Sequence, residues 1–208
     1  MKILIADDHA IVRHGLKQIL ADEFKKSTFG EARNGQEVLD SIWKEPWDVV
    51  VLDITMPGRS GLEVLKEVKK AKPKLPVLVL SMHPEDQFAV RVLKSGASGY
   101  MTKESAPAEL VGAVKKIMAG GRHISTSVAE IMATYLTLDS KRPPHEQLSN
   151  REFQVMRMIA SGKTVSEIAR MLSLSVRTIS TYRARILEKT GMKTNAELTH
   201  YAFQHSLV

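Results

Sequence analysis

Short runs of aliphatic residues, separated by amphipathic segments, constrain the fold of this chain more than any other feature of its sequence. The runs lie at residues 3–6, 49–52 and 77–80, and two weaker segments lie at 28–32 and 98–101. Continuous Val, Ile and Leu runs of four or five residues are typical of strands that are buried on both faces. We therefore expect five buried strands.

The segments between these runs have helical periodicity, with apolar residues recurring every three or four positions. They lie at residues 11–21, 35–43, 61–71, 85–94 and 107–119. Regular alternation of strand and helix predicts an α/β doubly wound, five-stranded parallel sheet. Functional sites in such folds lie beyond the carboxyl ends of the strands.

The remainder of the chain is expected to be helical. Residues 126–138 are amphipathic, and residues 139–147 are polar with two prolines, which predicts a flexible linker. Four N-capping signals then follow, at Ser149, Thr164, Ser175 and Thr194, and three of them have a glutamate three residues later. A tight turn at 172–175 between two of the helices predicts a helix-turn-helix.

Charge and composition limit the possible functions. The net charge is +7, and residues 121–208 contribute +5 of it, with 12 Lys or Arg and 7 Asp or Glu. A small basic module indicates a polyanionic partner, either nucleic acid or a membrane surface, and the plainer alternative is a solvated basic face; charge alone does not choose between them. The chain has no cysteine, which excludes disulfides and thiolate catalysis. No apolar run approaches the roughly 20 residues of a transmembrane helix, and we expect no membrane insertion.

Polar side chains follow the predicted strands. Asp7 and Asp8 follow the first predicted strand, Asp53 follows the third, and Ser81 and Lys103 follow the last two. Carboxylates that converge at one sheet edge repel by roughly 3 kcal/mol per pair at ~5 Å, and Mg²⁺ relieves such repulsion. With a hydroxyl and an ammonium nearby, this set could hold a transferring phosphoryl group, and an aspartate could be the nucleophile.

Four stretches of residues 1 to about 120 resemble the receiver domain of two-component response regulators: IADDH, LDITMPGRSG, LVLSMH and SGYMTK. The resemblance implies a flavodoxin-like fold with Asp53 as the phosphoacceptor. The implied Mg²⁺ ligands are Asp8 directly, Asp7 through water, Asp53, and the backbone carbonyl of Thr55. The implied catalytic and switch residues are Ser81, which bonds a phosphoryl oxygen, Lys103, which pairs with the phosphate, and Tyr100, an aromatic switch that turns inward.

Residues 148–208 resemble a LuxR-type DNA-binding domain, and with the receiver the whole chain resembles the NarL/FixJ family. On the predicted helix 176–190 we expect Val176, Ile179, Ile186 and Leu187 to face inward. The candidate DNA contacts are Thr164, Arg177, Thr178, Ser180, Thr181, Arg185 and Lys189. Ser180 and Tyr182 depart from the family pattern, where Lys and His are usual. The target sequence is therefore not predicted.

The last predicted helix, roughly residues 195–206, is implied by the resemblance to form the dimer. We expect Leu198, Tyr201 and Ala202 to be exposed or half-exposed there. Two other features favour plainer interpretations. His9 and His83 flank the pocket, and loop packing is preferred to a ligand role. The lysine-rich run 66–74 is most simply a solvated helix face, although it could contact a kinase.

The predicted domains are a receiver at 1–120, a linker with an amphipathic helix at 121–146, and a helix-turn-helix domain at 147–208. The preferred function is a cytoplasmic transcriptional regulator that a sensor histidine kinase phosphorylates at Asp53. It would bind double-stranded DNA as a homodimer, with no catalysis beyond its own phosphotransfer and dephosphorylation. The alternatives are a phosphorylation-independent regulator with a dimerising receiver, and an aspartyl-nucleophile phosphatase of the haloacid-dehalogenase type.

Overall fold

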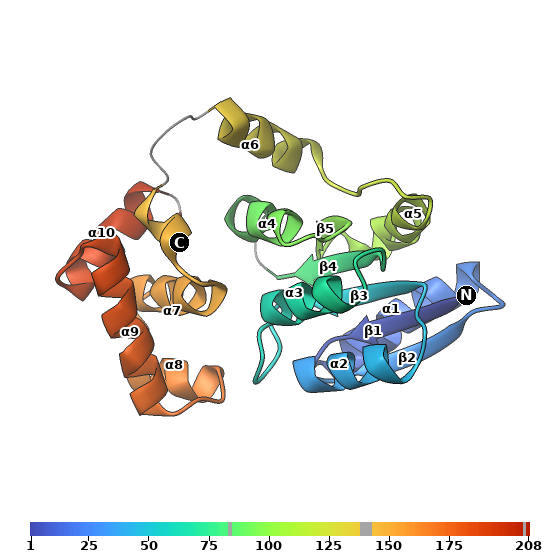
Figure 1. The fold of residues 1–208 in the computed structure, drawn as a ribbon, viewed down its shortest axis with the longest axis horizontal. Helices are drawn as coiled ribbons and strands as arrows, with labels where there is room; N and C mark the ends of the chain where they lie inside the picture. Colours follow the sequence, from blue (N-terminus) through green and yellow to red (C-terminus); the bar gives the residue numbers. More distant parts are fainter. Residues whose placement is uncertain (83–84, 138–142, 206) are drawn as a thin grey trace. The chain divides into compact units, whose positions relative to one another are not determined.

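The computed structural model describes residues 1–82, 85–137, 143–205 and 207–208. The chain divides into two compact units, Met1–Thr137 and Leu138–Val208 (Figure 1). The first unit contains a sheet with flanking helices, and the part of the second unit that the structure describes is helical.

The first unit is built on a five-stranded parallel sheet in the order β2-β1-β3-β4-β5. The strands are β1 (Lys2–Ala6), β2 (Thr28–Ala32), β3 (Val49–Asp53), β4 (Val77–Ser81) and β5 (Gly99–Thr102). This confirms the predicted doubly wound sheet. The strand order reverses between β1 and β3, so the carboxyl ends of these two neighbours open into the crevice where such folds bind ligands.

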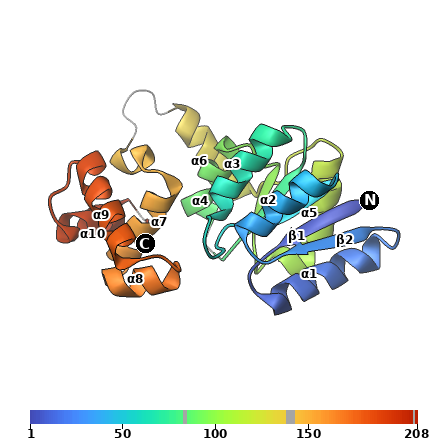
Figure 2. The same cartoon turned by 60° about the horizontal axis from the view of Figure 1, so that its bottom comes forward.

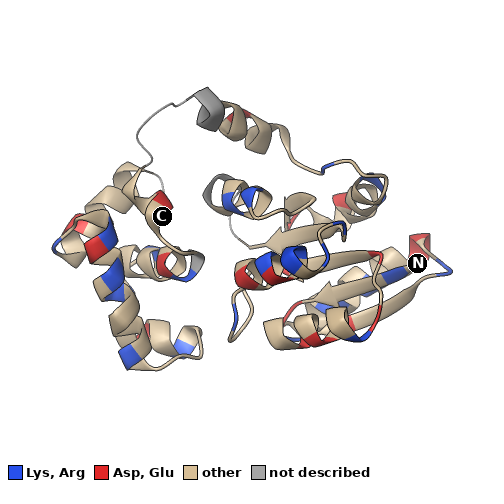
Figure 3. Cartoon of the chain, viewed as in Figure 1, with Lys and Arg blue, Asp and Glu red and all other residues tan. Residues whose placement is uncertain are grey.

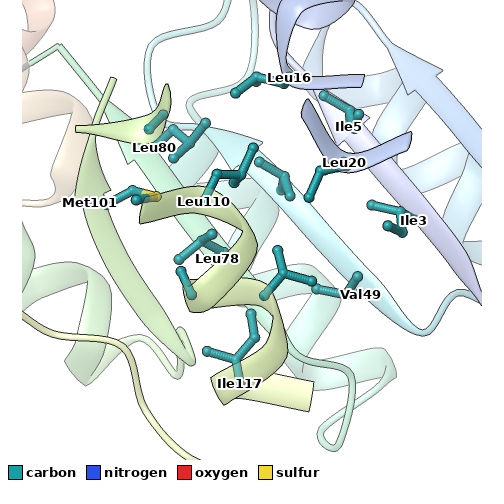
Figure 4. Close-up of a cluster of buried hydrophobic side chains, with 14 residues drawn as sticks. Ile3, Ile5, Leu16, Leu20, Val49, Leu78, Leu80, Met101, Leu110 and Ile117 are labelled. Atoms are coloured by element: carbon teal, nitrogen blue, oxygen red, sulfur yellow. The ribbon is translucent and has the colours of Figure 1, made fainter. Parts of the chain in front are cut away.

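Five helices cover the two faces of the sheet. They are α1 (Ala10–Glu23), α2 (Gly35–Lys44), α3 (Gly61–Ala71), α4 (Glu85–Lys94) and α5 (Ala106–Met118). Figure 2 shows α1 and α2 on opposite sides of β1 and β2. Leucines and isoleucines of α1 and α5 pack with alternate residues of β1, β3 and β4 in one apolar core (Figure 4). Alternate side chains of a strand point to opposite faces, so the aliphatic runs supply a core on each face.

A sixth helix, α6 (Thr126–Thr137), belongs to the first unit, where it contacts α4 and buries Val128 completely. The segment before it runs beside β5, and Gly99 and His123 form an isolated parallel bridge. Residue 138, at the end of the predicted helix, lies outside the described residues. The domain boundary at residue 120 stays a prediction.

The second unit contains a 3-10 turn, η1 (Pro144–Gln147), and four helices. These are α7 (Asn150–Ala160), α8 (Val165–Met171), α9 (Val176–Thr190) and α10 (Asn195–Gln204). Each helix begins at its predicted N-cap, and the capping boxes at Ser149 and Thr164 are complete. At Thr194 only half the box forms, because the Glu197 carboxylate accepts from the Lys193 amide.

The prediction of a flexible linker over residues 139–147 is wrong for its last four residues, which form the 3-10 turn η1. His145 is buried, and its Nδ1 lies 2.7 Å from the Tyr201 hydroxyl of α10. Its ring also lies beside that of Phe153 in α7. An aromatic histidine with a hydroxyl partner can therefore be buried in a segment whose composition is polar. Residues 139–142 lie outside the described residues.

Close packing at the edge of the sheet yields a stability prediction. A Cβ on Gly30 of β2 would lie 2.1 Å from Cη2 of Trp47, whose indole N–H is held by the Ser41 carbonyl at 3.0 Å. We expect Gly30→Ala to destabilise the first unit by about 1–3 kcal/mol, as overpacking does. Both tryptophans, Trp43 and Trp47, lie in this unit, so urea unfolding followed by tryptophan fluorescence reports on it alone.

Gly15→Ala is the matched control, because a Cβ there meets no atom within 4 Å. Gly15 lies within α1, where alanine stabilises a helix by up to about 1 kcal/mol relative to glycine. An unfolding midpoint for Gly30→Ala that equals or exceeds the wild-type value would contradict the close approach of Trp47.

Candidate phosphoacceptor site and nucleic-acid interface

Three aspartates meet at the carboxyl edge of the sheet. Asp7 and Asp8 follow β1, and Asp53 is the last residue of β3. Asp7 and Asp53 are buried, while Asp8 is exposed. One ligand atom from each of these three and from His9 lie within 4.8 Å of one another. The predicted acidic residues are therefore brought together, with a histidine beside them.

Lys103 contacts both buried carboxylates. Its Nζ lies 2.7 Å from Asp53 Oδ2 and 2.6 Å from Asp7 Oδ2. Burial by itself would lower the pKa of Lys103, but the two carboxylates outweigh it and the pKa is raised. Burial also raises the pKa of Asp53, and the attraction of Lys103 and the hydrogen bond from the Thr55 amide oppose that rise only in part. Lys103 therefore remains a cation that offsets two buried acids.

His9 contacts the acidic pair more closely than sequence reasoning expected. Its Nδ1 lies 3.0 Å from Asp8 Oδ1 and 3.2 Å from Asp7 Oδ1, and its backbone amide donates to Asp7 Oδ1 at 2.8 Å. The histidine is the N-cap residue of α1, so the start of this helix fixes its backbone beside the aspartates. Its position directly after Asp8 already places it beside the pocket in the sequence analysis, where loop packing is preferred to a ligand role. His83 lies outside the described residues.

A buried arginine holds the loop between β1 and α1. The Nη1 of Arg13 donates to the Asp7 carbonyl at 2.8 Å, and its Nε lies 3.4 Å from Glu31 Oε2 on β2. Lys17 reaches the other oxygen of Glu31 at 2.9 Å. Sequence reasoning missed this network, because it placed no charged residue of the first helix in the interior.

The loop after Asp53 depends on a glycine. A Cβ on Gly61 would lie 2.3 Å from the Asp53 carbonyl oxygen and 2.6 Å from Ile54 Cα, so only glycine allows the start of α3 to approach this backbone. A capping box between Ser60 and Glu63, also missed in the sequence, starts the helix there. The Thr55 amide donates to Asp53 Oδ1 at 2.9 Å.

The two remaining pocket residues lie on β4 and β5. Ser81 ends β4, is fully buried, and accepts the backbone N–H of Lys103 at its carbonyl at 2.8 Å. Tyr100 of β5 is also fully buried. The inward position that the resemblance implies for this aromatic residue is therefore the one in this structure. The roles of Ser81 and Tyr100 stay predictions.

In the second unit, most of the predicted DNA contacts share the exposed side of α9. Arg177, Ser180, Thr181 and Arg185 are exposed, and Thr178 is half-buried. Ile179 and Ile186 are fully buried on the other side, as predicted, but Val176 is 50% exposed and its predicted inward position is wrong. Val176 is the first residue of the helix, directly after the N-cap Ser175. Figure 3 shows basic segments along α9.

Two of the predicted DNA contacts have glutamate partners within the unit. The Thr164 hydroxyl caps α8 and donates to Glu167 Oε2 at 2.7 Å. The ammonium of Lys189 lies 2.7 Å from Glu152 Oε2, a buried carboxylate that also completes the capping box of α7. Lys189 therefore joins the end of α9 to the start of α7, and its contact with DNA stays a prediction.

The predicted exposure of α10 is wrong for two residues. Leu198 and Ala202 are completely buried against the rest of the unit, and Tyr201 is half-buried with His145 as its partner. The helix packs on α7 within the unit, and Leu198 and Ala202 are therefore core residues of this unit. Phe203, 64% exposed, is the large apolar residue that α10 presents to solvent.

The pair between Lys189 and Glu152 yields a pH-dependent prediction. Burial would raise the pKa of Glu152, but Lys189 and Ser149 together lower it below the ordinary 4.5. Its contribution to stability is therefore present above pH 4.5 and is lost as the pH falls through the folded value. We expect Lys189→Met to weaken the second unit at pH 7 by on the order of 1–2 kcal/mol, because Lys189 is partly exposed.

Amide hydrogen exchange in α7 and α9, corrected for intrinsic rates, measures this difference. The difference in the free energy of opening between wild type and Lys189→Met should become smaller as the pH falls below about 4.5. Lys193→Met is the control, since it removes the same charge from a lysine with no ion pair among the described residues. An equal effect of both substitutions, or a difference independent of pH, would refute the structural role of Lys189.

Two family models match the chain. The model described as the response regulator receiver domain matches residues 3–115, and the model described as bacterial regulatory proteins of the luxR family matches residues 146–202. Response regulator UvrY of Escherichia coli K12 is 35% identical over 208 residues, which cover 100% of this chain and 95% of the relative.

No helix in the described part of the chain is long and apolar enough to cross a bilayer.

The fold of this chain is also similar to solved structures of response regulators. RcsB of Salmonella enterica serovar Typhimurium, bound to promoter P1flhDC with the phosphomimetic BeF3⁻, has a TM-score of 0.60 and 28% identity over 97% of both chains. A structure of two RcsB dimers on two parallel DNAs has a TM-score of 0.60 and 29% identity, covering 100% of this chain and 98% of the other. The chain therefore belongs to the response regulators of the NarL/FixJ family, with a receiver domain followed by a LuxR-type domain.

Proposed function

We propose that this chain is a cytoplasmic, DNA-binding transcriptional regulator whose activity is switched by phosphorylation of Asp53. The observation that carries the proposal is the buried Asp53 carboxylate, with Lys103 at 2.7 Å and two further aspartates at the same sheet edge. A sensor histidine kinase is the proposed phosphodonor, as is usual for receivers.

The acidic edge suits Mg²⁺. Asp7, Asp8 and Asp53 offer carboxylate oxygens within 4.8 Å of one another, and hard divalent cations prefer such ligands. We assign Asp8 and Asp53 as direct ligands, Asp7 as a ligand through water, and the Thr55 carbonyl as a further ligand. When bound, the ion would neutralise charge on the carboxylates and on the incoming phosphoryl group.

The protein's own residues supply the remaining chemistry. The Asp53 carboxylate attacks the phosphorus atom, a new P–O bond forms, and the bond to the donor nitrogen breaks. Lys103 then pairs with the phosphoryl oxygens, and Ser81 donates a hydrogen bond to one of them. The phosphoryl group adds about −1.5 to −2 charges, enough to draw Lys103 and the Ser81 loop toward Asp53. This self-directed phosphotransfer and the later dephosphorylation of Asp53 are the only catalysis we assign.

The second unit supplies the output. Arg177, Thr181 and Arg185 lie on the exposed side of a helix that the helix-turn-helix arrangement would place in the major groove. The RcsB structures on DNA support this placement, and the RcsB dimers support binding as a homodimer. The proposed partners are therefore a kinase, double-stranded DNA and a second copy of the chain.

The two alternatives of the sequence analysis are less well supported. A haloacid-dehalogenase-type phosphatase has its nucleophile after the first strand, whereas the aspartate that accepts from the Thr55 amide is the last residue of β3. A receiver that serves only for dimerisation would not need a buried carboxylate, lysine and acidic pair held together at one edge.

Intact mass tests the phosphoacceptor directly. After incubation of the full chain with Mg²⁺ and acetyl phosphate, we expect wild type to gain one phosphoryl group, and Asp53→Asn to gain none. Removal of Mg²⁺ with a chelator should abolish the gain, because the acidic edge would repel the donor.

Asp40→Asn is the matched control, since Asp40 is an exposed aspartate on α2, away from the strand ends. It should gain a phosphoryl group at the wild-type rate. A gain in Asp53→Asn equal to that of wild type would refute Asp53 as the acceptor, and turnover that requires Asp7 or Asp8 as nucleophile would favour the phosphatase.

A further inference from the structure

The first unit carries a lysine-rich surface that the phosphoacceptor site does not use. We call it the α3 basic surface, and it consists of Lys69, Lys70, Lys72, Lys74 and Arg122. Residues 66–74 contain five lysines and a single acid, Glu67. The Glu67 carboxylate is already paired with Arg59 at 2.6 Å.

Local packing brings these cations together. The Nζ of Lys69 donates to the Leu75 carbonyl at 2.6 Å, which turns the segment after α3 back toward the helix. A Cβ on Gly96 would lie 3.2 Å from Lys69 Cγ, so the stem of this lysine lies against the turn that follows α4. Burial and the neighbouring charge of Arg122 both lower the pKa of Lys69. Residue 122, far along the chain, therefore belongs to the same surface.

The charges of this surface are not neutralised within the unit. In the part of the chain that the structure describes, none of its five cations forms an ion pair with a carboxylate. Lys70, Lys72, Lys74 and Arg122 are exposed. Unpaired like charges on one surface repel one another, and an anionic partner would reduce that repulsion.

Stabilisation of the helix end explains only part of the surface. Cations in the last turn of a helix contribute about 0.3–1 kcal/mol by opposing its dipole, and Lys69 and Lys70 occupy the last turn of α3. Lys72 is the C-cap residue and Lys74 lies beyond the helix. Arg122 comes from another segment. These three cations need a different explanation.

We propose that the α3 basic surface binds backbone phosphates of the DNA that the second unit engages, and so adds affinity that does not depend on sequence. The inference rests on the proposed DNA-binding function. Both units belong to one chain, so binding of the second unit raises the effective concentration of phosphate around the first to the millimolar range. Flexible lysines suit backbone phosphates, which require charge but little directional geometry.

The salt dependence of DNA binding tests this surface. The full chain would be titrated with a mixed-sequence DNA duplex by fluorescence anisotropy at several salt concentrations. We expect the triple variant Lys70→Gln/Lys72→Gln/Lys74→Gln to bind more weakly. The slope of log K against log salt should fall by about 0.9 for each lost phosphate contact, or up to about 2.7 for three.

A second triple variant, Lys25→Gln/Lys26→Gln/Lys44→Gln, is the matched control. These three lysines are exposed in the same unit and form no ion pair among the described residues, and Lys44 occupies the last turn of α2 as Lys70 does in α3. The control should keep the wild-type slope. Circular dichroism of both variants checks that they are folded.

Two results would overturn the inference alone. An equal fall in slope for both triple variants would show that only net charge matters. An unchanged slope in the α3 variant, with wild-type DNA binding intact, would exclude DNA as the partner and leave an acidic protein surface as the candidate. Failure of the wild-type chain to bind any duplex would overturn the proposed function as well.

Discussion

The structure of the pocket depends on the contacts of Lys103 with Asp7 and Asp53. Two buried carboxylates side by side would each cost several kcal/mol without a cation, and one ammonium within 2.7 Å of both offsets that cost. Because the carboxylates end β1 and β3 and the lysine follows β5, the same contacts join three strands at the carboxyl edge. With Asp8 added, the edge still carries more negative than positive charge, which is what a divalent cation needs.

The strand that precedes Lys103 also connects the pocket with the chain beyond the receiver sheet. The amide of Tyr100 donates to the His123 carbonyl at 3.0 Å, and the amide of His123 donates to the Ser98 carbonyl at 3.0 Å. The segment that leads into α6 is therefore hydrogen-bonded to the strand that carries the buried Tyr100. In a phosphorylation switch between two arrangements, a shift of β5 toward Asp53 would displace residue 123 through these two hydrogen bonds.

Much of the fold and of the pocket could be predicted, because each depends on local periodicity and on strand ends. Asp7, Asp53 and Ser81 follow aliphatic runs, Lys103 follows the weaker segment 98–101, and parallel strands bring such residues to one edge. Contacts between helices could not be predicted in this way. Leu198 and Ala202 of α10 were expected to be exposed or half-exposed, because the packing of this helix on α7 is not visible in the residue pattern. Likewise, the close approach of Gly61 to Asp53 and the pairing of Lys189 with Glu152 depend on tertiary distances that the residue pattern does not contain.

The central claim is that the pocket of the first unit controls the affinity of the second unit for DNA. The most direct measurement compares the dissociation constant for a mixed-sequence DNA duplex before and after treatment with acetyl phosphate and Mg²⁺, for wild type and for Asp53→Asn. The account predicts tighter binding after treatment for wild type only. Equal dissociation constants before and after treatment in wild type, with phosphorylation verified by mass, would contradict it.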